Sequence, residues 1–263
     1  MFKPILTALG LLLIPSVASA DDLRLVEPGK LTWGSSPTFV PFEFMREGKP
    51  VGFDVDLMEE IAKRSNLSSN IMVMEFKGVI PALLGNRIDA GVSGLYITAE
   101  RQQVADFIPY VIVGNQIVVQ KGNPKKVDGP ASLCGLKVGA PVSTAFEAAV
   151  NKASGECKAA GRKEIELLSL PGSNNVALAL AQGRIDAGVN STATAAAMLS
   201  ESPEVYELGG APFDVNTKVG IALRKTDTAL KTQLEGAMQA MVKDGTYAAL
   251  MKKWSLPAQS AAY

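Results

Sequence analysis

One short stretch occurs twice in this chain and constrains its fold more than any other feature. The sequence Arg-Ile-Asp-Ala-Gly-Val occupies residues 87–92 and again residues 184–189. Each copy follows an Ala/Leu-rich run that ends at Asn86 or Gly183, residue types that favour the end of a helix. Each copy therefore predicts a helix, a tight turn and a short buried strand. Two such units predict two α/β lobes.

A small polar residue follows each copy, Ser93 after the first and Asn190 after the second. Coincidence in an Ala- and Gly-rich chain is the alternative, but the matching helical runs and these polar residues argue against it. Ligands of open α/β sheets bind beyond the carboxyl ends of the strands. We therefore expect Ser93 and Asn190 on opposite walls of a cleft between the lobes.

The first twenty residues have the pattern of a secretory signal peptide. A basic start at Lys3 leads into an apolar run over residues 4–17 and then into Ala18-Ser19-Ala20. This pattern predicts cleavage after Ala20. The apolar run is too short to span a membrane. We expect an exported protein that does not span the membrane and that is periplasmic in a Gram-negative source.

The charge composition argues against several classes of partner. The chain has 26 basic and 26 acidic residues, and neither sign forms long runs. Nucleic acids and anionic membranes require clustered Lys and Arg, so neither is expected. The chain has no histidine, the commonest nitrogen ligand of zinc, and we expect no metal and no cofactor. The expected partner is a small molecule, and the expected state is a monomer.

Cys134 and Cys157 are the two cysteines of the chain. In an oxidising compartment an even pair favours a disulfide over a metal site. The bridge would stabilise the second lobe locally by about 3 kcal/mol.

Arg101 is an unusual residue for its position. The loop after Ser93 leads into a helix with Thr98 as the expected N-cap, which places Arg101 in the first turn. A positive charge there opposes the helix dipole, and an anion just beyond the helix would explain it. Ser143 and Thr144 lie at a second strand-to-helix turn, a geometry that can bind anions but usually binds nothing.

Seven segments in chain order carry a resemblance to a known family: residues 39–44, 51–57, 78–83, 87–90, 97–101, 104–107 and 244–247. Together they resemble the periplasmic solute-binding proteins of family 3, the polar amino-acid type that delivers ligands to ABC importers. The resemblance covers nearly the whole mature chain.

The resemblance implies two Rossmann-like α/β lobes joined by two hinge strands, in the type II order. Lobe 1 is expected to comprise residues 21–112 plus 211–263, and lobe 2 to be an insertion over residues 113–210. We expect strands over 110–120 and 218–223 to connect the lobes, which would allow closure around a ligand.

The resemblance also implies a set of site residues. In the family, the position of Arg101 pairs with the ligand carboxylate, helped by backbone N–H groups near Gly94 and at the Ser143-Thr144 turn. The positions of Phe39 and Phe76 stack on the ligand.

Three positions depart from the family pattern. Asn190 and Ser36 stand where acidic residues are usual, and Tyr96 stands where Thr is common. The sequence thus predicts a site without anionic groups for a free ammonium, whose burial without a counter-charge is costly. We hypothesise a carboxylate ligand with a substituted or absent amino group, such as an opine; an ordinary polar amino acid bound through carbonyl oxygens is the alternative.

Two other functions occur on, or are compatible with, this fold. One is a cyclohexadienyl dehydratase-like enzyme, and the other is a sensory receptor that docks on a membrane kinase. The lack of histidine, and of a recognisable pair of carboxylates in the expected cleft, argues against an enzyme. No motif separates a sensor from a transport receptor.

Overall fold

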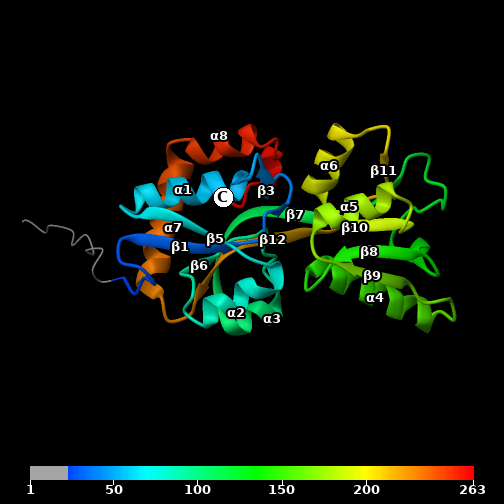
Figure 1. The fold of residues 1–263 in the computed structure, drawn as a ribbon, viewed down its shortest axis with the longest axis horizontal. Coiled ribbons are helices and arrows are strands. Elements are labelled where there is room, and N and C mark those ends of the chain that lie inside the picture. Colours follow the sequence, from blue (N-terminus) through cyan, green and yellow to red (C-terminus); the bar gives the residue numbers. More distant parts are fainter. Residues whose placement is uncertain (1–22) are drawn as a thin grey trace, which may run out of the picture.

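The computed structural model describes residues 23–263, so the predicted signal peptide and its cleavage site lie outside the described residues. Two lobes lie side by side along the long axis of the molecule (Figure 1). Strands in each lobe are covered by helices on both faces.

The main sheet has nine strands, eight of which follow the order β5-β1-β6-β12-β7-β10-β8-β9. Their bounds are β1 Lys30–Ser35, β5 Ser68–Val73, β6 Ala90–Gly91, β7 Ala105–Gln120, β8 Lys137–Pro141, β9 Glu166–Leu170, β10 Ala187–Ser191 and β12 Phe213–Arg224. The ninth strand, β11 (Tyr206–Leu208), pairs with β7. A small antiparallel sheet contains β2 (Thr38–Phe39), β3 (Glu43–Arg46) and β4 (Lys49–Val51).

The helices lie above and below these strands in Figure 1. Their bounds are α1 Phe53–Arg64, α2 Val79–Leu84, α3 Ala99–Val104, α4 Ala145–Ala159, α5 Ser173–Ala181, α6 Thr192–Glu201, α7 Thr228–Lys243 and α8 Thr246–Lys253. Short 3-10 turns occupy Phe76–Gly78, Pro130–Leu133 and Ala258–Ser260. Among the described helices, none is long and apolar enough to cross a membrane.

Two long antiparallel strands, β7 and β12, connect the lobes (Figure 1). The sequence predicts both strands, but each begins earlier than predicted, at Ala105 and Phe213. Their pairing is irregular between Phe213 and Thr217, where the register shifts. A register shift locally bends a strand pair, so this segment is suited to act as a hinge. The residue limits of the two lobes stay a prediction.

The repeated hexapeptide forms the same structure twice. Each copy follows a helix, α2 or α5, through a left-handed residue, Asn86 or Gly183, and enters a buried strand, β6 or β10. The unit of helix, turn and strand that the sequence predicts is therefore confirmed. The glycine of each copy permits the preceding helix to pack closely on the strand. A Cβ atom at Gly91 would lie 2.8 Å from Val79 of α2, and one at Gly188 would lie 2.7 Å from Val176 of α5.

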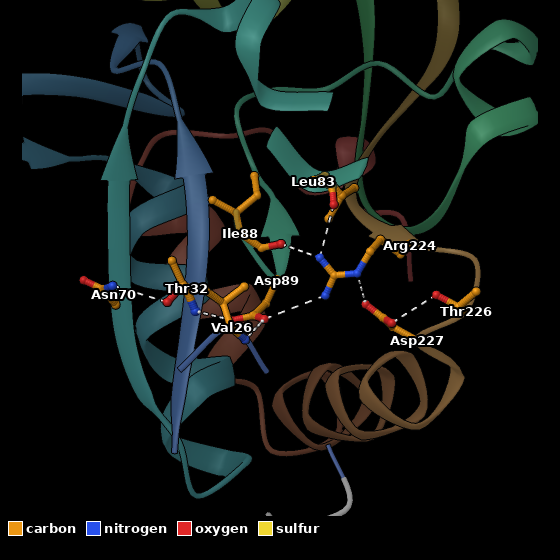
Figure 2. Close-up of polar contacts among 9 residues, drawn as sticks. All are labelled: Val26, Thr32, Asn70, Leu83, Ile88, Asp89, Arg224, Thr226 and Asp227. Carbon is orange, nitrogen blue, oxygen red and sulfur yellow. Dashed lines mark hydrogen bonds and ion pairs between the residues drawn. The ribbon is translucent and has the colours of Figure 1, made fainter. Parts of the chain in front are cut away.

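The aspartate of each copy fastens its turn to the neighbouring strand. The Asp89 carboxylate accepts hydrogen bonds from the backbone N–H groups of Val26 (2.7 Å) and Thr32 (2.8 Å), as Figure 2 shows. The Asp186 carboxylate accepts one from Lys137 N (2.9 Å). These bonds satisfy backbone donors at the starts of β1 and β8, which explains why the motif requires an acid there.

Arg224, at the end of β12, joins the first copy to the last part of the chain (Figure 2). Its guanidinium donates to the carbonyl oxygens of Ile88 (2.6 Å) and Leu83 (3.2 Å) and pairs with Asp227 at 2.6 Å. A longer ion pair of 3.8 Å reaches Asp89. The returning strand is thus fixed to lobe 1.

Cys134 and Cys157 form the predicted disulfide, with Cα atoms 5.6 Å apart. It connects the end of the 3-10 turn at 130–133 to the last turn of α4.

Two local predictions from the sequence are wrong. The apolar helical pattern over residues 52–64 predicts Asp54 as the N-cap of the first helix. Gly52 holds that position instead, and the Asp54 side chain turns inward to Gly94 and Tyr110. The sequence also predicts a strand over residues 71–76, but this strand, β5, ends at Val73 because the chain turns at Phe76 into a 3-10 helix.

Candidate ligand-binding site

A pocket with an empty volume of about 400 Å³ lies between the lobes. Lobe 1 contributes Ser36, Thr38, Phe39, Glu43, Phe76, Ser93, Gly94, Tyr96 and Arg101. Lobe 2 contributes Pro141, Thr144, Ala145, Phe146, Pro171, Gly172 and Ser173. The pocket therefore combines the carboxyl ends of β1, β6 and β8 with the N-termini of α4 and α5.

Arg101 supplies the positive charge of the pocket. Thr98 caps α3 by accepting a hydrogen bond from Arg101 N, which confirms the predicted cap. The guanidinium donates to Tyr96 O (2.8 Å) and, across the cleft, to Ser143 O (3.3 Å). It also lies 5.3 Å from the centre of the Phe76 ring.

The Arg101 charge has no acidic partner in the described chain. None of the salt bridges formed by residues 23–263 includes it. Burial lowers the pKa of Arg101, because desolvation disfavours the charged form, and the nearby Glu100 only partly offsets this effect. A guanidinium has five N–H donors, so donors remain for a bidentate anion. The arrangement favours an anionic ligand.

The Ser143-Thr144 turn faces Arg101 from lobe 2. Thr144 caps α4 by accepting a hydrogen bond from Glu147 N (3.2 Å). Ser143 has a left-handed φ of 61°, and its N–H donates to the Glu147 carboxylate at 2.7 Å. That backbone donor is therefore already used, and Thr144, not Ser143, lines the pocket.

Three aromatic rings meet inside the pocket. Phe146 of α4 lies 5.1 Å from Tyr96 and 5.9 Å from Phe39, measured between ring centres. Phe39 also stacks on Phe42 at 5.1 Å. Phe146 was missed by the sequence reasoning, because an apolar residue early in a helix is typical of an ordinary core position.

Gly94 is required where the Phe39 ring packs. Its φ is +54°, and a Cβ atom would lie 2.5 Å from two carbons of that ring. Glycine is the one residue type that suits both conditions.

Ser93 connects two walls of the pocket. Its hydroxyl accepts a hydrogen bond from Ser36 N (3.0 Å) and donates one to Glu43 Oε1 (2.9 Å). Both serines are buried and line the pocket, as the sequence predicts for a cleft position.

Glu43 and Asp54 form a buried pair of carboxyl groups beneath Ser93. Glu43 is 1% exposed and Asp54 is fully buried, and each has one buried oxygen, Glu43 Oε2 and Asp54 Oδ1, without a hydrogen-bond partner. Asp54 Oδ2 accepts from Gly94 N (3.0 Å) and from the Tyr110 hydroxyl (2.8 Å). Glu43 lines the pocket and Asp54 does not, so the prediction that the cleft lacks an acidic side chain is wrong.

This pair favours the protonated form. Burial raises the pKa of Glu43 well above its ordinary value, and the neighbouring Asp54 charge raises it further. Burial also raises the pKa of Asp54, against the effect of the Gly94, Glu43 and Tyr110 hydrogen bonds. Neighbouring buried carboxyl groups resist ionising together, so the pair favours retaining a proton.

Asn190 does not belong to the lining of the pocket. It is fully buried within β10, and its amide nitrogen is 3.9 Å from Met198 Sδ. A strand residue whose side chain points into the lobe interior is indistinguishable from one that points into the cleft by sequence alone. The predicted binding role of Asn190 stays a prediction.

The sequence of residues 31–257 matches the family model of the bacterial extracellular solute-binding proteins, family 3. The chain belongs to this family. It is 34% identical over 256 residues to the histidine-binding periplasmic protein of Salmonella typhimurium, which covers 94% of this chain and 95% of that protein. The family resemblance seen in the sequence is therefore confirmed.

Solved structures show the same fold. An ancestral arginine-binding protein bound to arginine has a TM-score of 0.79 and 36% identity, over 86% of this chain and 98% of that one. A substrate-binding protein of an amino acid ABC transporter has a TM-score of 0.76 and 28% identity, over 86% and 99%. The predicted α/β fold of two lobes, periplasmic binding protein type II, is confirmed. These relatives of the family 3 chain are named as binding proteins, not as enzymes.

Proposed function

We propose that this family 3 protein binds one small amino acid or amino-acid derivative by its carboxylate and delivers it to an ABC permease. The single observation that carries this proposal is Arg101, a partly buried guanidinium in the pocket with no acidic partner in the described chain. The names of the relatives, which include amino-acid-binding and ABC transporter proteins, support the same ligand class.

The Glu43-Asp54 pair changes which amino groups the pocket can accept. Glu43 lies in the lining of the pocket, hydrogen-bonded to Ser93, and supplies a negative charge there when it is ionised. A buried cation requires such a counter-charge. The proposed ligands therefore include α-amino acids with a free ammonium as well as substituted amino acids such as opines.

The predicted export fits this role. We propose that residues 1–20 are removed as a signal peptide, with cleavage after Ala20, and that the mature protein acts as a periplasmic monomer. N-terminal sequencing of the secreted protein tests the cleavage site, and light scattering tests the oligomeric state.

The experiment is a calorimetric titration with amino acids and opines, using wild type, Arg101→Ala and Arg101→Lys. Loss of the charge-assisted hydrogen bonds to the carboxylate should weaken binding by about 3 kcal/mol, or roughly 100-fold in Kd, in Arg101→Ala. Arg101→Lys keeps the positive charge but loses the bidentate geometry, so its Kd should lie between those of wild type and Arg101→Ala. Unchanged Kd values in a folded Arg101→Ala protein would refute the proposal. Assays for turnover of prephenate and arogenate should be negative.

A further inference from the structure

Phe146 is a residue of lobe 2 whose ring contacts two aromatic rings of lobe 1. It lies in the first turn of α4, immediately after the Ser143-Thr144 turn, and is 4% exposed. Its ring is held between Phe39 and Tyr96, which both belong to lobe 1. The other residues that lobe 2 places in the pocket are small or cyclic: Pro141, Thr144, Ala145, Pro171, Gly172 and Ser173.

The two rings that hold Phe146 are themselves fixed. The Tyr96 hydroxyl lies 3.5 Å from Gly114 O of β7, and its backbone bridges to Val219 of β12. Phe39 packs on Phe42 and directly on Gly94. Close-packed interiors resist displacement of such rings, so Phe146 has little room to move aside while the cleft is closed.

These rings bound the space that remains for a ligand. With a carboxylate held at Arg101, the rest of the ligand must lie among Phe39, Tyr96 and Phe146, which line the same pocket. Phe39, Tyr96 and Phe146 are all buried, so little of the space beside Arg101 is left unfilled.

We infer that Phe146 sets the size limit of the ligand: it fills the space that a long side chain would occupy and restricts the site to carboxylates with short side chains. This inference rests on the proposed function and specifies its ligand class. It distinguishes the chain from relatives that are named for histidine or arginine.

The test compares wild type with Phe146→Ala and a control, Phe146→Leu, which retains most of the apolar volume. Binding of L-alanine, the short opine alanopine, L-histidine and L-arginine is measured by calorimetry. Wild type and Phe146→Leu should bind the two short ligands at least about 10-fold more tightly than L-arginine. In Phe146→Ala, the ratio of the Kd for L-arginine to the Kd for the short ligands should fall by at least about 10-fold, because the smaller side chain opens space for a long ligand. Thermal unfolding checks the fold of each variant. If Phe146→Ala does not fold, Phe146→Val provides the same comparison.

The possible results distinguish the size limit at Phe146 from the carboxylate site at Arg101. Wild type that binds L-arginine as tightly as L-alanine, or a Phe146→Ala protein with an unchanged ratio, would overturn the size limit and leave the carboxylate site intact. If none of the four ligands binds to wild type or to the variants, the proposed function itself is wrong, and the size limit with it.

Discussion

At the scale of single residues, the pocket is defined by two ionisable groups. Arg101 is a partly buried cation that contacts carbonyl oxygens and an aromatic ring. Glu43 and Asp54 are a buried pair of carboxyl groups that contact hydroxyl and amide donors. Glu43 and Arg101 are 58 residues apart in the sequence, and folding brings them into one cavity.

The shared proton of Glu43 and Asp54 predicts a pH-dependent stability. Because burial and the Asp54 charge raise the pKa of Glu43 above its ordinary value of 4.5, the unfolded chain releases this proton at a lower pH than the folded protein. The free energy of unfolding should therefore decrease as the pH rises from 4.5 towards the folded pKa. Tyr110, whose own pKa is raised by burial, faces the pair and stays protonated in this range.

Glu43→Gln is the matched control for this pH dependence. Glutamine can donate to Asp54 and accept from Ser93, but it does not titrate. Urea unfolding between pH 5 and pH 9 should show a smaller loss of stability with rising pH in Glu43→Gln than in wild type. Identical slopes would mean that the pair does not carry the shared proton.

Gly94→Ala should impair both stability and binding. A Cβ atom at this left-handed position would lie 2.5 Å from the Phe39 ring, which would have to move. Overpacking of this kind costs about 1–3 kcal/mol. Chemical unfolding measures the first effect and calorimetry the second. Gly236→Ala, where a Cβ atom meets nothing within 4 Å, is the control and should be nearly neutral.

At the scale of structural elements, the repeated hexapeptide is a unit that fastens a helix, a turn and a strand to the neighbouring strand. The two copies share the aspartate bond to that strand but differ in their surroundings. Asp89 is fully buried near Arg224, whereas the Asp186 side chain is 27% exposed near Lys125. The same motif therefore has a different energetic importance in each lobe.

This difference predicts unequal effects of the same substitution. Asp89→Ala leaves the backbone N–H groups of Val26 and Thr32 without their acceptor and removes the longer of the two ion pairs of Arg224, which should destabilise the protein by about 2–4 kcal/mol. Asp186→Ala loses one backbone hydrogen bond and an exposed ion pair, which should cost about 1–2 kcal/mol. Denaturant unfolding of both variants checks the order; a larger effect at Asp186 would contradict it.

The disulfide fixes the end of α4 to the 3-10 turn at residues 130–133. Replacing Cys134 and Cys157 together by alanine should lower the free energy of unfolding by about 3 kcal/mol, because the unfolded chain regains the freedom of a 23-residue separation. Ligand affinity should change little, since the bridge is at the opposite end of α4 from Thr144 and Phe146. A large change in Kd would show that the bridge also positions the N-terminus of the helix.

At the scale of the whole molecule, the cleft is closed by contacts that join distant parts of the chain. The Thr194 hydroxyl of α6 donates to Val40 O at 2.7 Å, and Arg101 donates to Ser143 O. The ring of Phe146 adds an apolar contact between the lobes. A ligand held between the lobes would add to these contacts and stabilise the closed form through differential affinity.

Ligand binding should therefore raise the thermal stability of the whole protein. At a ligand concentration 100 times Kd, the free energy of unfolding should increase by about 2.7 kcal/mol. Thermal-shift measurements with the ligands above provide the test, and Arg101→Ala, with its roughly 100-fold weaker Kd, should gain only about 0.4 kcal/mol at the same concentrations. An equal shift in that variant would place the binding site elsewhere.

The sequence alone determined the features that depend on local pattern or on motif. The Ala/Leu-rich runs and the hexapeptide predicted the two α/β units and the cleft position of Ser93, and the family segments predicted the fold and other pocket residues, including Arg101 and Phe39. The local predictions are correct because helix ends, buried strands and helix caps are determined by residues close together in the chain.

Only the tertiary structure decided which side chains face one another. Asp54 looked like a helix cap and is instead one half of a buried pair with Glu43. Phe146 looked like a core residue and lies in the ligand pocket, whereas Asn190 looked like a cleft residue and lies in the lobe interior. The physical reason is that proton sharing, ring packing and cleft exposure depend on distances between residues far apart in sequence, which local pattern does not encode.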